Sequence, residues 1–290
     1  MSHLKLLDAI TSTVITLIIT AAMSHAATIY DSGGFEAPRF VAVPTANNLA
    51  GQDPTPAGQG PWQQDAGTST AVVQTNTPQA GLQAVEVQRL VGATGDTRWF
   101  VTKPVTPTPA SSVINIDFDM SVNIPAVLTH GPLFGVEAYD ASSATPKLVG
   151  GLLLDAAQGT VLYDLTGTGA PTATDTFLTR NAYHHFTLSA DFFTHDYSIY
   201  ADGNLLHTES FVDPTASAFT YAPIAALAFA DPSETSKAFF DNYTITQTSI
   251  VPEPGCVALF AVAGMTLRIR RRTPAACGLA SVSLRTDKRR

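Results

Sequence analysis

The segment INIDFDM, from Ile114 to Met120, carries the clearest structural pattern in the chain. Apolar and polar residues alternate along it, and successive side chains of a β-strand point to opposite faces. One face therefore carries Phe118 with the aliphatic residues, and the other carries Asn115, Asp117 and Asp119. This period of two predicts a half-buried strand, whose apolar face packs on a core while its polar face meets solvent.

Short runs of the same kind recur along most of the chain, between clusters of Gly, Pro, Asp, Asn, Ser and Thr, and helical periodicity is nearly absent. A hairpin turn is expected at Asp202-Gly203, a pair that tolerates positive φ. Residues 43–81 are rich in Pro, Gly, Gln, Thr and Asn and are expected to form a long loop layer. Many antiparallel strands without helices predict an all-β, two-sheet jelly-roll sandwich. The expected strands are 83–90, 97–102, 112–124, 133–139, 147–154, 160–163, 184–189, 196–201, 204–210, 224–229 and 238–247, of which the continuously apolar 224–229 suits a central position.

The N-terminus has the features of a secretory signal peptide. Lys5 supplies a positive charge, residues 9–23 are mostly apolar, and Ser24-His25-Ala26 is a small-x-small cleavage site. We therefore expect residues 1–26 to form a signal helix and residues 27–250 to form one exported domain, long enough for a well-buried core.

The C-terminus carries a second ordered set of signals. An extended Pro-Glu-Pro strip is followed by an apolar run, 255–267, and then by a cluster of arginines suited to a cytoplasmic membrane face. The run is shorter than the roughly 20 residues that span a bilayer unaided. The residues concerned are Pro252, Glu253, Pro254, Arg268, Arg270, Arg271 and Arg272.

This order resembles the PEP-CTERM sorting signal. The resemblance covers 251–272 and implies processing by an exosortase-type enzyme, transient anchoring in the inner membrane through a short apolar helix, and delivery to the cell envelope or extracellular matrix. One departure is that residues 273–290 continue as a basic tail, expected to be disordered. The alternative is a short C-terminal helix with a basic end.

Charge and cysteine content narrow the partners of the body. Residues 27–250 hold 7 Lys/Arg and 21 Asp/Glu, a balance of −14, which opposes binding to nucleic acid and other polyanions. Cys256 and Cys277 both lie in the tail, so the body has no disulfide. An exported domain without disulfides relies on a large core, on bound calcium, or on both.

A second resemblance rests on Tyr183–Leu188 and Tyr197–Gly203, which look like a hairpin of concanavalin A-like and laminin-G-like jelly rolls, as found in carbohydrate-binding modules. Gly33–Glu36 and Ala238–Ile245 are similar to the first and last strands of such modules. There the two strands pair, and an early Glu and a late Asp share a structural calcium ion. The resemblance thus implies Glu36 and Asp241 as calcium ligands, with Asp31 as a third; the alternative is that these are solvated charges at strand ends.

Sugar binding favours aromatic rings beside polar groups. Trp62 lies in a polar loop sequence and is the better tryptophan platform, with a packing role as its alternative, whereas Trp99 beside Phe100 is expected in the core. Tyr139 and Tyr163 are further candidates for ligand binding, as is Tyr221.

An enzyme is the opposing hypothesis. Hydrolases of concanavalin A-like fold carry a Glu-x-Asp-x-(x)-Glu pattern, which is missing here, and the glutamates of the body are isolated. Asp117 and Asp119 are the nearest approach to a dyad, but the solvent face of an edge strand explains them as well. His184 and His185 point to opposite faces of a strand, and no third ligand joins them.

These observations predict an exported, non-enzymatic envelope or matrix protein that binds extracellular polysaccharide and not nucleic acid. Two alternatives remain open. One is a purely structural surface or adhesion protein, and the other is a glycoside hydrolase or lyase of the same fold.

Overall fold

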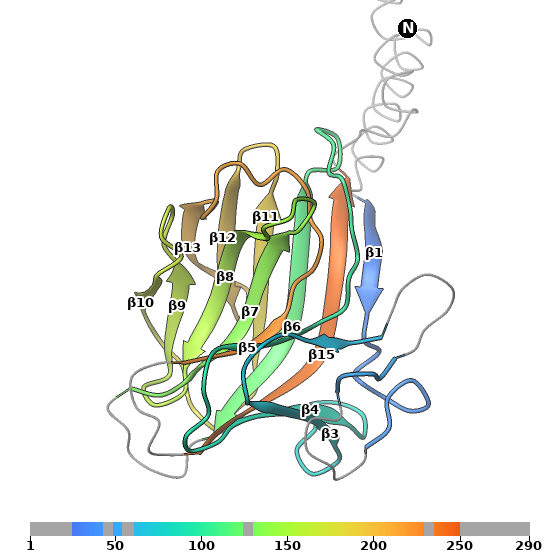
Figure 1. Ribbon diagram of the computed structural model, residues 1–290, viewed down its shortest axis with the longest axis vertical. Coiled ribbons are helices and arrows are strands. Elements are labelled where there is room, and N and C mark those ends of the chain that lie inside the picture. The colour runs from blue at the N-terminus through green and yellow to red at the C-terminus, as the bar shows by residue number, and fades with distance from the viewer. Residues whose placement is uncertain (1–24, 43–48, 54–60, 124–129, 229–234, 250–290) are drawn as a thin grey trace, which may run out of the picture. The chain divides into compact units, whose positions relative to one another are not determined.

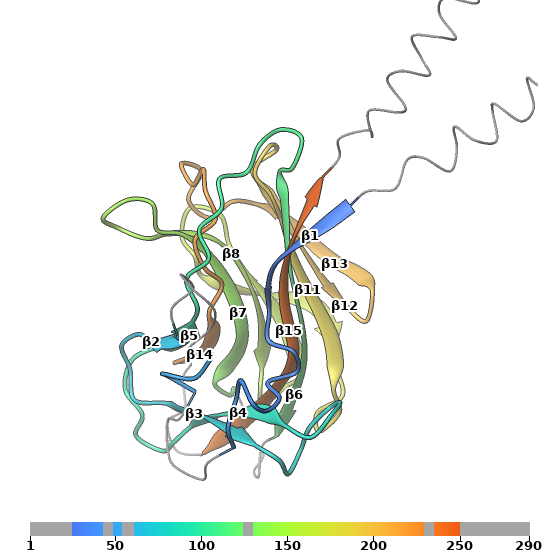
Figure 2. The same ribbon diagram turned by 90° about the vertical axis from the view of Figure 1, so that its right-hand side faces the viewer.

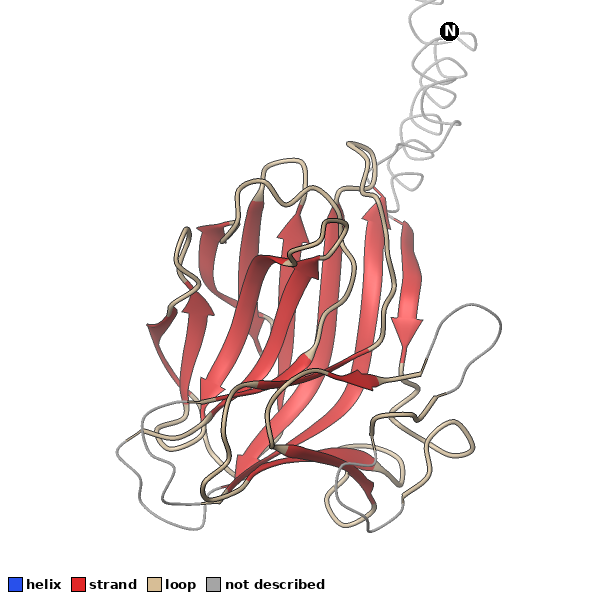
Figure 3. Cartoon of the chain, in the orientation of Figure 1, coloured by secondary structure: helices blue, strands red, loops and turns tan. Residues whose placement is uncertain are grey.

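The computed structural model describes residues 25–42, 49–53, 61–123, 130–228 and 235–249. Of the predicted signal helix, residues 1–24 lie outside these ranges, whereas residues 25 and 26 begin the first strand, His25–Asp31. The sorting segment and the basic tail also lie outside them. Every regular element in the described part of the chain is a strand (Figure 3). Residues His25–Ile250 form one compact unit.

Two antiparallel sheets face each other as layers (Figures 1 and 2), which confirms the jelly-roll sandwich. The first, named here the β6 sheet, has the order β13 (Asn204–Ser210), β12 (Asp196–Ala201), β11 (His184–Asp191), β6 (Val113–Asn123), β15 (Ser236–Ser249), β4 (Ala84–Arg89) and β3 (Thr70–Gln74), and β1 (His25–Asp31) pairs with β15. The second, the β7 sheet, has the order β10 (Pro171–Phe177), β9 (Thr160–Asp164), β8 (Lys147–Asp155), β7 (Leu133–Asp140), β14 (Ile224–Leu227), β5 (Thr97–Phe100) and β2 (Gln63–Gln64).

The core lies between the two sheets and is filled by the side chains at every second position of the strands. Ile114, Ile116, Phe118 and Met120 of β6 are fully buried, as the period of two predicts. The sheets approach closely at Gly150 of β8, where an added Cβ would lie 2.6–2.7 Å from ring atoms of Tyr197 on β12. A side chain at this position would therefore displace the tyrosine.

Three expectations need correction. Residues 43–81 are not loop throughout, because β2 and β3 form there and complete the two sheets. β6 is not an edge strand: it lies between β11 and β15, and its aspartates lie on the outer face of the sheet, where Asp117 is partly exposed and Asp119 is buried. The first strand is His25–Asp31, and Gly33–Glu36 belongs to the turn that follows it.

Candidate active site on the outer face of the β7 sheet

An arginine and two carboxyl groups meet on the face of the β7 sheet that points away from the core. Val136 and Ala138 of β7 point inward, so Glu137 between them points outward. Gly151 of β8 lies opposite Glu137. A Cβ added to Gly151 would lie 2.1 Å from Asp164 Oδ2 and 3.3 Å from Glu137 Cγ, so both acidic side chains converge over this glycine.

Arg98 reaches the cluster from β5 across the short strand β14. Its cross-strand neighbours are Ala225 and then Gly135, whose small side chains leave room for the guanidinium. Arg98 Nε and Nη2 donate to Glu137 Oε2 and Oε1 at 2.5 and 3.1 Å. Burial lowers the pKa of Arg98, but the hydrogen bonds and charge of Glu137 outweigh this effect and leave the pKa raised. The side chain of Arg98 is 20% exposed and that of Glu137 only 3%, so the cation covers the carboxylate.

Asp164 is buried beside this ion pair. Its residue is 1% exposed, and its Oδ2 finds no hydrogen-bond partner among the described residues. Burial, followed by the negative charge of Glu137, raises the pKa of Asp164 to about 8, against a smaller opposing effect of Arg98. At neutral pH the cluster therefore holds one protonated carboxyl group next to a carboxylate that is paired with arginine.

Three stacked rings border the cluster. Tyr221 lies between Tyr139 and Phe100, at centroid distances of 5.3 and 4.5 Å. The guanidinium carbon of Arg98 lies 5.9 Å from the ring centroid of Tyr139. Burial, then the charge of Glu137, raises the pKa of Tyr139, so its hydroxyl stays protonated. All three rings are partly exposed and form an aromatic margin beside the charged groups.

The sequence patterns did not point to Arg98, Glu137 or Asp164 as site residues. One signal was present, because Glu137 interrupts the otherwise apolar run LFGVEAY, and a buried charge needs a partner. The partners come from strands far apart in sequence, which are brought together only by the order β9, β8, β7, β14, β5.

The predicted calcium ligands anchor a loop. Asp241 Oδ2 accepts the backbone N–H groups of Gln79 and Ala80, each at 3.0 Å, and Glu36 Oε1 accepts those of Leu82 and Gln83 at 2.6 and 3.0 Å. Asp31 Oδ1 accepts the N–H of Gly33 instead of joining them. The described residues contain no group of three or more His, Cys, Asp or Glu that could hold a metal ion. This arrangement fits amide donors better than calcium, which takes about six to eight oxygens, and a calcium site here stays a prediction.

The aromatic residues proposed for sugar binding differ in their burial. Trp62 as a sugar platform is wrong, because the residue is 1% exposed, packs between Tyr30, Phe35 and Tyr243, and donates its indole N–H to Tyr30 Oη. Trp99 is fully buried, as expected. One face of Tyr163 is covered by His207, at a centroid distance of 3.8 Å.

The acidic residues of β6 have a partner that the sequence did not reveal. His185 of β11 lies opposite Asp119, and its Nδ1 is 2.9 Å from Asp119 Oδ1. Its Nε2 is 3.8 Å from Asp117 Oδ1. His184 points elsewhere, toward Asp202 and the carbonyl of Thr179. His184 and His185 therefore point in different directions, as expected. His185 contacts both Asp119 and Asp117 on the outer face of the sheet.

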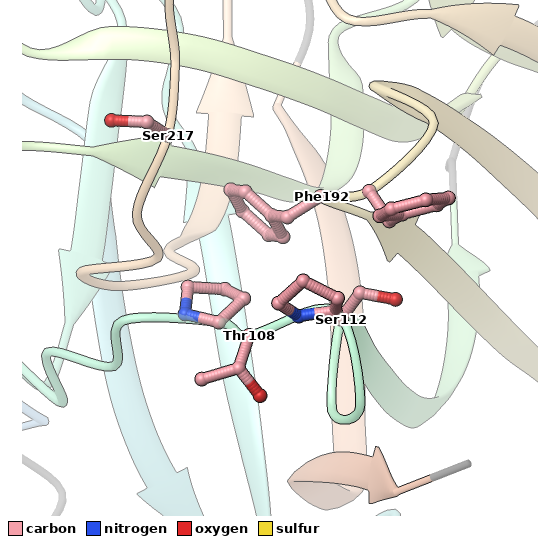
Figure 4. A pocket seen from close by; sticks show the side chains of 7 residues that line it. Thr108, Ser112, Phe192 and Ser217 are labelled. Carbon is pink, nitrogen blue, oxygen red and sulfur yellow. The ribbon is translucent and has the colours of Figure 1, made fainter.

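A small pocket of about 80 Å³ lies between the loop before β6 and the β11–β12 turn (Figure 4). Phe192 lies across it from the segment that carries Thr108 and Ser112. Its lining is prolines, phenylalanines and hydroxyl groups without an ionisable side chain, so it offers neither acid nor base.

Comparisons with known proteins bear on the fold. No family model matches the chain, and no curated protein sequence matches it. Among solved structures it is similar to alginate lyase vAL-1 from Chlorella virus, at 11% identity over 64% of this chain and 93% of that one, with a TM-score of 0.46. It is similar to an endo-β-1,4-glucuronan lyase from the fungus Trichoderma reesei, at 10% identity over 62% and 87%, with a TM-score of 0.42. It also resembles a sialidase, at 11% identity and a TM-score of 0.44, over 63% of this chain but only 16% of the sialidase.

Alginate and glucuronan lyases predominate among these structures. That finding contradicts the prediction of a non-enzymatic protein. The resemblance of 251–272 to a sorting signal is not tested by any of these comparisons. Within the described ranges, no helix is long and apolar enough to cross a membrane.

Proposed function

We propose that this protein is an enzyme that cleaves glycosidic bonds in a uronate-containing polysaccharide by β-elimination. The observation that carries the proposal is the meeting of Arg98, Glu137 and Asp164, which supplies a cation, a base and an acid at one place. Pairs of carboxyl groups whose surroundings separate their protonation states are typical of acid–base sites.

The three side chains have distinct tasks in this reaction. Arg98 pairs with the uronate carboxylate and so makes the neighbouring C5–H bond more acidic. Glu137 takes the C5 proton, the electron pair forms the C4–C5 double bond, and the C4–O4 bond breaks. Asp164 gives its proton to the departing O4. Glu137 then holds a proton that Asp164 lacks, and their convergence over Gly151 allows its return.

Burial of the two carboxyl groups sets a condition on this chemistry. Arg98 is the exposed member and covers Glu137. A uronate carboxylate that takes over the guanidinium releases Glu137 from its ion pair, so substrate binding itself frees the base. Before that exchange the base stays blocked.

Hydrolysis is the second candidate, since a protonated and an ionised carboxyl group are also the equipment of glycoside hydrolases. Elimination is preferred because it alone requires a cation beside the base, as Arg98 provides.

Product analysis tests the proposal. The full chain is incubated separately with alginate, glucuronan, polygalacturonate and cellulose oligosaccharides, and both ultraviolet absorbance of the conjugated C4–C5 double bond and new reducing ends are followed. We expect absorbing product from at least one uronate polymer, and its loss by at least 100-fold in Glu137→Gln. The matched control is Glu86→Gln, which breaks a 2.7 Å ion pair with Lys237 on the other sheet and leaves the rate unchanged.

New reducing ends without absorbance would replace elimination with hydrolysis. No cleavage of any of these polymers, or full activity of Glu137→Gln, would refute the enzymatic proposal.

We also propose that the protein is exported and sorted through 251–272 to the envelope or the extracellular matrix, where its polysaccharide lies. The support is the order of Pro-Glu-Pro, apolar run and arginines. Fractionation of cells that express the chain with Pro252-Glu253-Pro254 replaced by alanines tests this. Retention in the membrane fraction is expected, and unchanged release would contradict it.

A further inference from the structure

A second surface suited to a ligand lies on the outer face of the β6 sheet, on the opposite side of the sandwich from the Arg98–Glu137–Asp164 cluster. It is a shallow hollow of about 300 Å³, a volume at the lower end of small-molecule sites. It is lined by Asn115, Asp117, Thr187, Ser189, Tyr200 and Gly203. These residues come from three adjacent strands and one hairpin turn, so the sheet itself holds the surface in shape.

Strand register brings the lining together. Asp117 of β6, Thr187 of β11 and Tyr200 of β12 lie opposite one another in one row across the strands. Asn115 and Ser189 form the next row on the same face. Neighbouring strands are about 4.8 Å apart, so each row presents a ladder of side chains across the sheet.

The polar atoms of the hollow are only partly used inside the protein. Thr187 Oγ1 donates to Asp117 Oδ1 at 2.6 Å, and His185 Nε2 lies 3.8 Å from the same oxygen. Asp117 Oδ2, Ser189 Oγ and Tyr200 Oη have no hydrogen-bond partner among the described residues. Asn115 Nδ2 donates to Thr248 Oγ1 at 3.1 Å, which orients its amide. The hollow therefore offers one free carboxylate oxygen and two hydroxyl groups on a fixed frame.

An apolar strip adjoins these groups. Leu205 of β13 lies opposite Tyr200 and is 58% exposed, and the ring of Tyr200 is itself partly exposed. A tyrosine and a leucine side by side at the end of a row of hydroxyl, carboxylate and amide groups match a pyranose, which has C–H faces and a rim of hydroxyls.

The charge of the lining selects the ligand class. It contains one carboxylate and no Lys or Arg, so it repels a uronate or phosphate and accepts hydrogen bonds from neutral hydroxyls.

We propose that this hollow, with Leu205 at its edge, binds a neutral glycan chain through its hydroxyl groups. The inference is independent of the cleavage reaction, which uses the other sheet. It gives the protein a means of holding an uncharged polysaccharide while the β7 sheet faces a different one.

Binding of defined oligosaccharides tests this inference. The full chain in the Glu137→Gln background is titrated with cellohexaose, mannohexaose, xylohexaose and oligogalacturonate by calorimetry. We expect saturable binding of at least one neutral hexasaccharide, weakened at least tenfold by Asp117→Ala and by Tyr200→Ala. The control is Phe177→Ala, which removes a 69% exposed aromatic ring from β10 of the other sheet and leaves the affinity unchanged.

Far-UV circular dichroism and the melting temperature of each variant separate loss of the site from loss of the fold, and Asp117→Asn, which keeps the side-chain shape, serves where Asp117→Ala unfolds. Three results would each overturn the proposal: no binding of any neutral hexasaccharide, the same affinity in the Asp117 and Tyr200 variants as in their parent protein, or tighter binding of oligogalacturonate than of the neutral hexasaccharides. Failure here leaves the cleavage test untouched, because that test monitors product.

Discussion

Asp164 is a buried carboxyl group that the fold keeps although it lowers the free energy of unfolding. A buried carboxyl oxygen without a partner is costly, and the cost depends on its protonation. Its pKa of about 8 in the folded chain compares with an ordinary value of 3.8. Between these two values the folded state holds a proton that the unfolded state releases. The free energy of unfolding therefore falls as pH rises from about 4 to 8.

Asparagine at 164 removes this titration and keeps the shape. We expect the free energy of unfolding of Asp164→Asn to fall less than that of the wild type between pH 5 and pH 8, with a difference on the order of a few kcal/mol. Asp175→Asn, an exposed aspartate on β10, is the control and should follow the wild type. Parallel curves for Asp164→Asn and wild type would mean that Asp164 is ionised or accessible in the folded protein.

Glu137 and Glu86 contrast a covered ion pair with a surface one. Glu137→Gln removes the nearer of the two carboxylates beside the Arg98 guanidinium and leaves Asp96 at 3.7 Å, and breaking a buried pair costs about 3–5 kcal/mol. Arg98 is one-fifth exposed, which moves the expectation to the lower end of that range. Glu86→Gln affects a pair whose members are 21% and 38% exposed, and we expect less than about 1 kcal/mol. Urea unfolding of both variants checks this, and equal losses would contradict the distinction.

The alternation of apolar and polar residues predicted where most strands lie in the sequence. It did not predict which strands are neighbours in the sheets. β6, β11, β12, β13 and β15 follow from the period of two and from the Asp202-Gly203 turn, where both residues do have positive φ. β10, with the sequence PTATDTF, has no apolar face and forms because β9 offers it backbone partners. The active-site candidate depends on strand order, which the pattern within one strand does not contain.

The contact between Gly150 of β8 and Tyr197 of β12 sets the distance between the sheets at one point. Gly150→Ala places a methyl group against the ring, and such overpacking costs about 1–3 kcal/mol. A smaller residue at 197 makes room, so Gly150→Ala with Tyr197→Leu should lose less than the sum of the single variants. Additive losses in urea unfolding would show that the two positions do not constrain each other.

For the whole molecule, charge runs against the proposed substrate. The body from 27 to 250 carries a balance of −14, so a uronate polymer is repelled at a distance and held only by local contacts such as Arg98. Salt screens this repulsion, with a Debye length of about 10 Å at 0.1 M. We expect kcat/KM on the uronate polymer to rise roughly severalfold between 0.01 and 0.2 M salt, because the shorter Debye length weakens the repulsion between the acidic body and the polymer. A steady fall of kcat/KM with added salt would contradict this expectation and would indicate that a positive surface attracts the polymer.

The pH dependence of cleavage reports on the protonation of Asp164, because elimination on the β7 sheet needs a protonated Asp164 beside Glu137. The measurement is kcat/KM for formation of ultraviolet-absorbing product from the uronate polymer that the full chain cleaves. We expect the rate to fall as pH rises through about 8, the pKa of Asp164, and Asp164→Asn to be inactive at every pH. A rate that continues to rise above this pH, or product formation by Asp164→Asn at the wild-type rate, would contradict it.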